Sequence, residues 1–175
     1  MADFAVTAVG ADRPGIVAAL TERLLSVGGN LADVRAALLR GSFAMVLVVA
    51  VPDEISAADL EATLEPTARE LGMGIWVGPA EPPATAPPGD ACMISVYGAD
   101  RPGIVSGMTA ALAERQVNIL DLSSRLVGDP SIYVLGIEAE LPSGLSPEAL
   151  EQALGPVADQ HGVELSLRAM GDDVL

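Results

Sequence analysis

The stretch that decides the fold is Gly10-Ala11-Asp12-Arg13-Pro14-Gly15-Ile16-Val17, and the same eight residues return as Gly98-Ala99-Asp100-Arg101-Pro102-Gly103-Ile104-Val105. The two copies lie 88 positions apart in a chain of 175 residues. A long stretch of sequence that returns at a fixed offset indicates a duplicated structural unit. We therefore interpret the chain as two copies of one fold, each beginning shortly before this motif.

The repeat extends well beyond the motif. Asn30-Leu31-Ala32-Asp33 matches Asn118-Ile119-Leu120-Asp121 at the same offset. From Pro52 and Pro142 onward the offset is 90, which indicates two inserted residues near the turn signal Gly128-Asp129-Pro130. An insertion confined to a turn, with register kept on both sides, is what two copies of one fold should show.

Hydrophobic periodicity predicts the same order of elements in both copies. In the first copy it predicts a helix that has Pro14 in its first turn, a second helix capped by Ser56, and strands over 4–9, 30–39, 43–51 and 74–77. In the second copy it predicts helices over 103–115 and 146–161 and strands over 91–97, 118–127, 132–141 and 163–168. The near-continuous apolar run at 43–51 favours a central strand.

The order β-α-β-β-α-β is typical of the ferredoxin-like fold, a four-stranded antiparallel sheet with two helices on one face. The fold class is therefore α+β, with two ferredoxin-like βαββαβ domains. We expect the domains at residues 1–78 and 91–170, with an acidic tail at 171–175. Residues 79–90 form a proline-rich linker, which should be semi-rigid.

Composition excludes several classes of function. The net charge is −15 and all nine cationic side chains are arginines, which argues against direct nucleic-acid binding and excludes lysine-based chemistry. Cys92 is the only cysteine, so no intrachain disulfide forms and a cytoplasmic location is expected. The acidic start lacks the features of a signal peptide, and no apolar run approaches the roughly 20 residues of a membrane span.

The motif loops are the best candidates for ligand binding. Each loop precedes a helix N-terminus, where free backbone N–H groups suit a carboxylate or a phosphate. Asp12 and Asp100 could accept hydrogen bonds from an ammonium group, and a carboxylate with an ammonium describes an amino acid. The alternative is that the motif only starts a helix, with an acid near its positive end. The candidate residues in the two motifs are Asp12, Pro14, Gly15, Ile16, Asp100, Pro102, Gly103 and Ile104.

Asn30 and Asn118 complete the candidate set. Asp12 and Asn30 should lie at opposite ends of a helix of about 12 residues, ~18 Å apart, so they cannot hold one small ligand together. If a pseudo-two-fold axis relates the copies, Asp12 meets Asn118 and Asp100 meets Asn30. The hypothesis is two equivalent sites between the domains, and the alternative is that both asparagines are turn residues after a helix.

A strand, then Asp-Arg-Pro-Gly-Ile, a helix, and Asn-Leu or Asn-Ile opening the next strand resembles the ACT domain, a regulatory amino-acid-binding module. The resemblance covers nearly the whole chain apart from the linker and the tail. Two such domains without an attached enzyme resemble the glycine cleavage system transcriptional repressor family. Members of that family are thought to sense an amino acid and to act through a protein partner.

The resemblance also implies roles for individual residues. The positions of Asp12 and Asp100 are polar ligand contacts, those of Asn30 and Asn118 are contacts from the neighbouring domain, and the domains pair edge strand to edge strand. Some members carry a histidine two residues before the aspartate. Gly10 and Gly98 stand there in this chain, which removes a side-chain ligand.

The expected function is a small-molecule sensor that binds an amino acid and acts on a protein partner such as a transcription factor or an enzyme. No cofactor, metal site or catalysis is expected, because His161 aligns with Leu71 on a helix and Cys92 with Phe4 on a strand. The alternative is a ligand-free interaction module whose acidic surface suits a basic partner. Exposed edge strands favour further pairing into a homo-oligomer.

Overall fold

The computed structural model describes residues 1–80 and 89–170, so most of the expected linker and the whole acidic tail lie outside the described residues. The chain divides into two compact units, Met1–Ala84 and Thr85–Leu175. Each unit has its own cluster of buried apolar side chains. The two units are therefore described separately.

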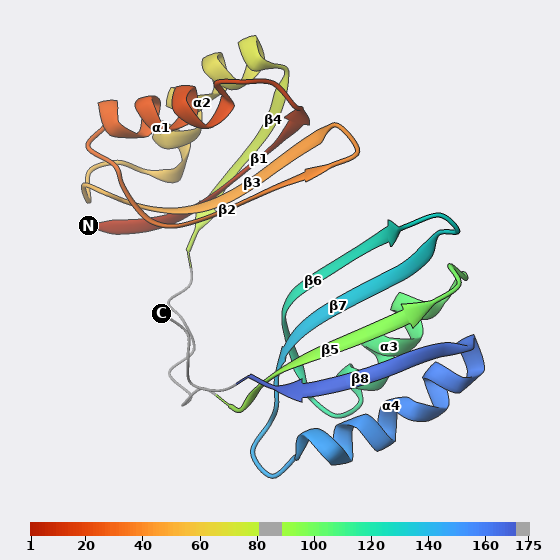
Figure 1. Ribbon diagram of the computed structural model, residues 1–175. Helices are drawn as coiled ribbons and strands as arrows, with labels where there is room; N and C mark the ends of the chain where they lie inside the picture. Colours follow the sequence, from red (N-terminus) through yellow and green to blue (C-terminus); the bar gives the residue numbers. More distant parts are fainter. Residues whose placement is uncertain (81–88, 171–175) are drawn as a thin grey trace. The chain divides into compact units, whose positions relative to one another are not determined.

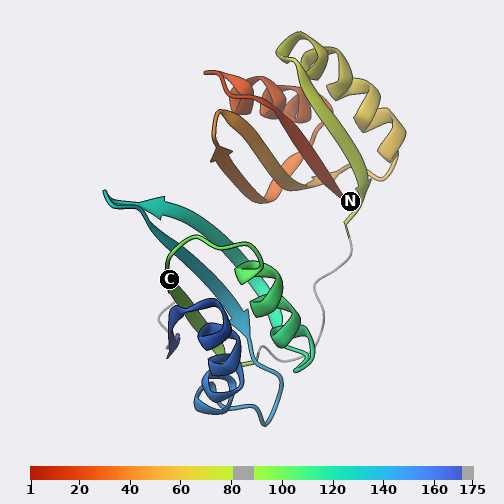
Figure 2. The same cartoon turned by 90° about the vertical axis from the view of Figure 1, so that its right-hand side faces the viewer.

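The first unit is a four-stranded antiparallel sheet with both helices on one face (Figures 1 and 2). The strands run in the spatial order β2-β3-β1-β4, so β3 is central, as its apolar sequence predicts. The elements are β1 (Ala2–Ala11), α1 (Ile16–Ser26), β2 (Asn30–Leu39), β3 (Ser42–Val51), α2 (Ala57–Leu71) and β4 (Met73–Pro79).

The second unit repeats this architecture in the order β6-β7-β5-β8. Its elements are β5 (Ala91–Gly98), α3 (Ile104–Ala113), β6 (Asn118–Val127), β7 (Ile132–Glu140), α4 (Pro147–His161) and β8 (Val163–Ala169). The tandem ferredoxin-like fold predicted from the repeat is confirmed. The two-residue insertion lies where the sequence places it, since four residues separate β6 from β7 and only Arg40 and Gly41 separate β2 from β3.

Period-two alternation on the central strands builds each core. Met45 and Leu47 of β3 are buried and pack below the helices, whereas Val46 between them is exposed on the other side. The helices contribute apolar side chains at three- and four-residue spacing. In the first unit these side chains are Ile16, Leu20, Leu24, Leu60, Leu64 and Ala68.

The four helices begin in two different ways. Ser56 caps α2 by accepting from the Asp59 N–H, and Ser146 caps α4 by accepting from the Ala149 N–H. In contrast, α1 begins after Gly15, whose φ is +93°, and α3 begins after Gly103, whose φ is +98°. The prediction that Pro14 lies in the first helical turn is wrong, because this left-handed glycine stands between Pro14 and the helix.

β2 and β6, each one of the two outer strands of its sheet, carry a β-bulge at the same place. The pairing of β2 with β3 shifts between Leu31 and Asp33, and the pairing of β6 with β7 shifts between Ile119 and Asp121. Each bulge inserts one extra residue, which is Ala32 in the first unit. The bulge follows directly after the asparagine that opens the strand and so changes which side chains share a face.

Candidate functional site

The motif loop of the first unit joins three elements. The Asp12 N–H donates to the Gly41 carbonyl at the tip of the β2–β3 hairpin over 2.9 Å. The Gly15 carbonyl accepts from the Ala19 N–H over 2.9 Å and so makes the first hydrogen bond of α1. Asp12 and Asp100 are both exposed. Asp12 is therefore held at this end of its sheet, beside a helix N-terminus, and Asp100 follows β5 and precedes α3 at the equivalent position.

The N-termini of α1 and α3 have no side-chain partner in the part of the chain that the structure describes. Neither helix has a side-chain cap or an acidic residue in its first turn. The first N–H groups of a helix have no intrahelical acceptor, and together with the helix dipole they favour an anion. Since α2 and α4 are capped by serines, the two motif helices are the ones left open to an anionic group.

Arg13 and Arg101 hold the motif loops in place, a role that the sequence reasoning missed. Arg13 Nη2 donates to the Glu70 carbonyl over 2.7 Å, and Arg101 Nη1 donates to the His161 carbonyl over 2.9 Å. Both carbonyls belong to the last turn of the second helix of their unit, where cations are favoured by the helix dipole. The arginine of the motif therefore fastens its loop to the neighbouring helix.

Gly10 and Gly98 leave no room for a side chain at the position where some family members carry histidine. A Cβ atom at Gly10 would lie 2.9 Å from the Gly72 carbonyl oxygen, and one at Gly98 would lie 2.8 Å from Val163 Cγ1. The strand that follows the second helix approaches closely in both units. A ligand-binding side chain is therefore excluded at these positions without a shift of the neighbouring strand.

The remaining motif residues divide into exposed and buried ones. Pro14 and Pro102 are exposed, whereas Ile16 and Ile104 are each 2% exposed and belong to the cores. The isoleucine side chains anchor the start of each helix. Any contact that these two positions make with a ligand would therefore come from the backbone N–H.

The asparagines lie far from the aspartates of their own unit. Asn30 pairs with Ala50 of β3, and Ala11, which precedes Asp12, pairs with Ser42 at the other end of the same strand. Eight residues of a strand span about 26 Å. The prediction that one unit alone cannot place Asp12 and Asn30 on one small ligand is confirmed by this register.

The bulge brings a second polar residue to each asparagine. Asn30 lies opposite Ala50 and Asp33 lies opposite Val48, and residues 48 and 50 share one face of β3. Asn118 and Asp121 likewise lie opposite Glu140 and Glu138. In a regular strand, residues three apart face opposite sides. Asp33 and Asp121 are therefore additional candidate ligand-binding residues on the face of Asn30 and Asn118. Strand periodicity alone would assign them to the opposite face.

The two asparagine sites differ in charge. Asn118 faces Glu140, whose carboxylate accepts from the Gly89 N–H over 2.7 Å, whereas Asn30 faces Ala50. Glu140 and Asn118 line a surface hollow of about 220 Å³, together with Gly89, Gln116, Leu141, Pro142 and Ser143. The asparagine position of the second unit is therefore more acidic and suits a cationic group better.

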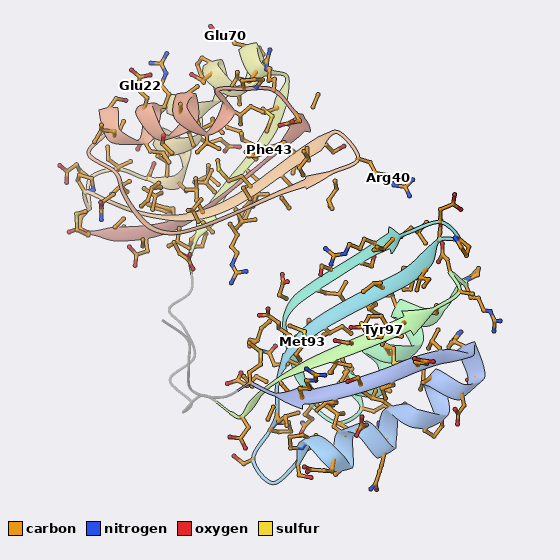
Figure 3. The ribbon with its side chains drawn as sticks, viewed as in Figure 1. Glu22, Arg40, Phe43, Glu70, Met93 and Tyr97 are labelled. Carbon is orange, nitrogen blue, oxygen red and sulfur yellow. The ribbon has the colours of Figure 1, made fainter. Side chains whose placement is uncertain are left out.

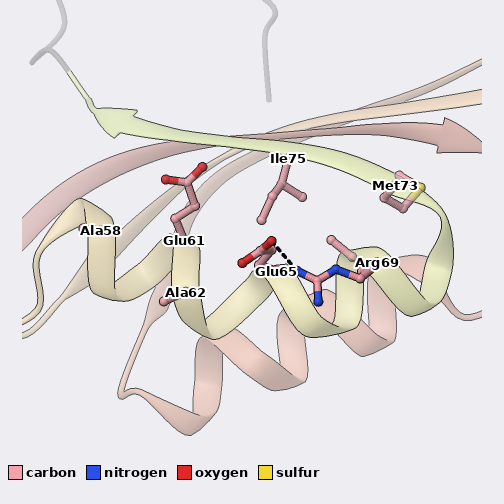
Figure 4. A pocket seen from close by; sticks show the side chains of 8 residues that line it. Ala58, Glu61, Ala62, Glu65, Arg69, Met73 and Ile75 are labelled. Carbon is pink, nitrogen blue, oxygen red and sulfur yellow. Dashed lines mark hydrogen bonds and ion pairs between the residues drawn. The ribbon is translucent and has the colours of Figure 1, made fainter.

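A different hollow lies between α2 and β4 of the first unit (Figure 4). Its walls include the ion pair between Glu65 and Arg69 and the apolar side chains of Met73 and Ile75. No motif residue or candidate asparagine lines it. We therefore do not assign the candidate site to this hollow.

His161 has a packing role in the second unit. A Cβ atom at Gly103 would lie 2.9 Å from its Cε1 atom, and one at Gly107 would lie 3.2 Å from its Nε2 atom. The imidazole ring is half-buried and rests on the first turns of α3, where the glycines give it space. This histidine therefore occupies the helix interface rather than an open cleft.

Within residues 1–80 and 89–170, no group of three or more histidine, cysteine, aspartate or glutamate side chains could hold a metal ion. The Cys92 thiol is buried on β5, and burial raises its pKa. No helix among the described residues is long and apolar enough to cross a membrane.

The fold and the duplicated motif define a class of protein, the tandem repeats of a ferredoxin-like βαββαβ unit. The model of the ACT domain family matches residues 3–77 and again residues 91–168. The chain therefore belongs to the ACT domain family and contains two copies of the domain.

Proteins from several organisms are similar to this chain. A UPF0237 protein of Methanopyrus kandleri is 38% identical over 73 residues, which are 41% of this chain and 81% of that protein. The glycine cleavage system transcriptional repressor of Escherichia coli is 32% identical over 121 residues, 69% of this chain and 63% of the repressor. The crystal structure of an unknown protein from Galdieria sulphuraria superposes with a TM-score of 0.84 at 28% identity, and covers 97% of this chain and 98% of that one.

Proposed function

We propose that this protein is an amino-acid sensor that regulates a protein partner, in transcriptional control of amino-acid metabolism. The observation that carries the proposal is a contrast between helix N-termini. Helices α1 and α3 follow the two identical motifs and have no side-chain cap, whereas α2 and α4 lack the motif and are capped by serines. Membership of the ACT domain family and the similarity to a transcriptional repressor support it. Because both units are acidic, we expect action through a protein rather than by direct contact with nucleic acid.

The proposed chemistry assigns one group of the ligand to each kind of residue. The α-carboxylate would accept from the free N–H groups at the start of α1 or α3. The α-ammonium would donate to Asp12 or Asp100, and a neighbouring unit would add the asparagine and the aspartate that the bulge places beside it. Under the sequence hypothesis, Asp12 combines with Asn118 and Asp100 combines with Asn30.

The difference between the asparagine positions predicts two unequal affinities. A site that includes Asn118 also gains the carboxylate of Glu140, whereas a site that includes Asn30 gains none at that position. An extra carboxylate near an ammonium group strengthens binding, and it weakens binding of the carboxylate end. We therefore expect two binding steps, with tighter binding where the ammonium end faces Glu140.

A thermal-shift screen of the full chain against the twenty amino acids tests the proposal. A ligand present at 100 times its dissociation constant stabilises the native state by about 2.7 kcal/mol. The shift should disappear in the double variant Asp12→Ala, Asp100→Ala. It should persist in the matched double variant Glu61→Ala, Glu151→Ala, which removes exposed carboxylates at equivalent places on α2 and α4. Absence of a shift with every amino acid would contradict the sensor function.

The alternative is an interaction module without a ligand. The acidic composition favours it, because a basic partner would be attracted whether or not a ligand is bound. The two functions differ in one measurable property: a sensor must bind its ligand unequally in two states, so its affinity for the partner changes with the ligand. A partner affinity that no amino acid alters would favour the interaction module.

A further inference from the structure

The face of the sheet that the helices leave open differs strongly between the two units. In the first unit a row across the four strands consists of Arg35, Val46, Thr7 and Trp76. Val46 is 48% exposed and Trp76 is 56% exposed. The open-face residues of the two inner strands carry no charge. They are Ala5, Thr7 and Val9 on β1 and Ala44, Val46, Val48 and Ala50 on β3.

The second unit has polar residues at the same places. The row that corresponds to Arg35, Val46, Thr7 and Trp76 consists of Ser123, Gly136, Ser95 and Ser166. Val48 of the first unit corresponds to Glu138, and Gly78 corresponds to Arg168. Figure 3 shows Met93 and Tyr97 on β5, which are flanked on this face by Glu138, Arg168 and Glu164. The open face of the first unit therefore has an apolar centre, with Asp33 and Arg35 at its β2 edge, whereas the open face of the second unit is charged on its inner strands.

We propose that the open face of the first unit is an interface with the same face of a second copy of this chain. We call this surface the β3 face and define it by Ala5, Val9, Ala44, Val46, Val48 and Trp76. The proposal does not depend on ligand binding by the motif loops. It concerns a face of the sheet, whereas edge-to-edge pairing would use the outer strand β2.

The charge on the β3 face and its β2 edge sums to zero, because Asp33 and Arg35 carry opposite signs, so two copies of this acidic chain repel each other least there. The chain has a net charge of −15, so a partner attracted by charge would be basic and would match the carboxylates of the second unit. The β3 face suits such a partner poorly, because Val46, Val48 and Ala44 cannot pair with a cation and Asp33 at its β2 edge is offset by Arg35. A face with an apolar centre and no net charge is complementary to another such face, and a two-fold axis presents identical faces to each other.

The size of the face is sufficient for a specific contact. Four strands about 4.8 Å apart, over roughly eight residues of about 3.3 Å, give about 500 Å² per copy. Two copies would bury about 1,000 Å², which is near the lower limit for a specific protein interface. The side chains in the centre are small or flat, and the Trp76 ring lies over Gly78, where a Cβ atom would overlap it. Two such sheets can approach to the usual sandwich spacing of about 10 Å.

Trp76 is the only tryptophan of the chain, so its fluorescence reports on the β3 face alone. We expect the emission maximum to move to shorter wavelength as the protein concentration rises, in step with dimer formation in sedimentation velocity. Val48→Glu gives the first unit the residue that the second unit carries there. It should raise the dimer dissociation constant by about a hundredfold or more, because each copy then buries an uncompensated carboxylate.

Two further variants keep the test decisive. Val46→Glu places the charge at a site already half exposed and should act in the same way as Val48→Glu. Val134→Glu is the matched control at the open face of the second unit and should leave the dimer unchanged. Far-UV circular dichroism checks that each variant is folded. A dimer in which Trp76 stays exposed, a monomer at all concentrations, or a dimer that survives both substitutions would overturn the proposal.

Discussion

Gly15 and Gly103 each connect a motif loop to the helix that follows it, and each adopts a left-handed backbone conformation. A φ near +95° is strained for any residue with a Cβ atom. Gly15→Ala meets no atom within 4 Å, so we expect only the backbone cost of about 1–2 kcal/mol. Gly103→Ala should cost more, because its Cβ atom would lie 2.9 Å from His161 Cε1. Urea denaturation followed by circular dichroism measures both.

Gly155→Ala is the control for these substitutions. Gly155 lies inside α4 with ordinary helical backbone and open space around it. Alanine there should change the stability by less than about 1 kcal/mol, because its better helix propensity is opposed by crowding of its Cβ atom against Pro156. A loss in this variant as large as that at Gly103, or equal losses at Gly15 and Gly103, would contradict the distinction between backbone strain and crowding.

At the residue scale the sequence predicted the exposed aspartates and asparagines but not their companions. Asp12 could be found because its motif is duplicated and precedes a helix. Asp33 could not be assigned, since the bulge that turns it to the face of Asn30 leaves no signal in the period-two pattern. Arg13 could not be assigned either, because its acceptor, the Glu70 carbonyl, lies 57 residues away in the chain.

Among the elements, α2 has the most complete N-terminal cap. Ser56 Oγ accepts from the Asp59 N–H over 3.2 Å, and the Ser56 N–H donates to the Asp59 carboxylate over 3.0 Å. Ser56→Ala should therefore destabilise the first unit by about 1 kcal/mol, measured as a lower midpoint of urea unfolding. Ser143→Ala, in the exposed turn before α4, is the control and should have little effect.

The same caps predict a dependence on pH. The Ser56 hydroxyl and backbone N–H lower the pKa of Asp59, and the backbone N–H of Glu148 and the Ser146 hydroxyl lower the pKa of Glu148. A lowered pKa means that the stabilisation is present above the usual values of 3.8 and 4.5 and is lost as pH falls through the folded-state pKa. Asp59→Asn should therefore lose stability at pH 7 but little at a pH below the lowered pKa of Asp59.

That prediction is checked by urea unfolding of both proteins across the acid range. The difference between wild type and Asp59→Asn should shrink steadily toward low pH, where the wild-type carboxylate is also neutral. Thr63→Ser, one turn further along the exposed side of α2, keeps the carboxylate and should follow the wild-type pH profile. A difference that is constant with pH would show that the charge of Asp59 is not involved.

At the scale of elements, the spacing of apolar residues predicted the extent of the helices better than the rule that proline ends a helix. Pro66 and Pro156 lie inside α2 and α4, where a proline removes a backbone hydrogen bond and usually ends a helix. Both helices nevertheless continue to their left-handed glycine caps at Gly72 and Gly162. Two buried leucines before each proline and a buried alanine after it, Ala68 or Ala158, hold the helix against the sheet, so the lost bond does not terminate it.

For the whole molecule, two separate cores predict unfolding that differs between the units. Leu64→Ala removes a side chain that is 1% exposed and should destabilise the first unit by about 2–5 kcal/mol. Trp76 reports the first unit, and both tyrosines, Tyr97 and Tyr133, lie in the second. We expect the tryptophan transition to move to lower temperature while the tyrosine transition stays. Equal shifts of both would show that the units unfold as one.

For the whole molecule, the internal repeat was the basis for predicting two copies of one fold. Eight identical residues and a shared offset were enough to establish the order of elements in both halves, because one fold had to satisfy both sequences. The pairing of Asp12 with Asn118 stays a prediction, since no local pattern encodes the position of one unit against the other. The different open faces also escaped the sequence reading, because the conclusion needs the register of all four strands.

The bulge after Asn30 and Asn118 has a further consequence for the life of the protein in a crowded cell. An outer strand with unpaired backbone groups can recruit strand after strand and seed a fibre. The bulge breaks the straight ladder after two residues, so an added strand can pair with residues 33–39 or 121–127 but not continue in register to the end. β2 and β6 are thereby restricted to a short, bent partner, and growth from these two edges is disfavoured.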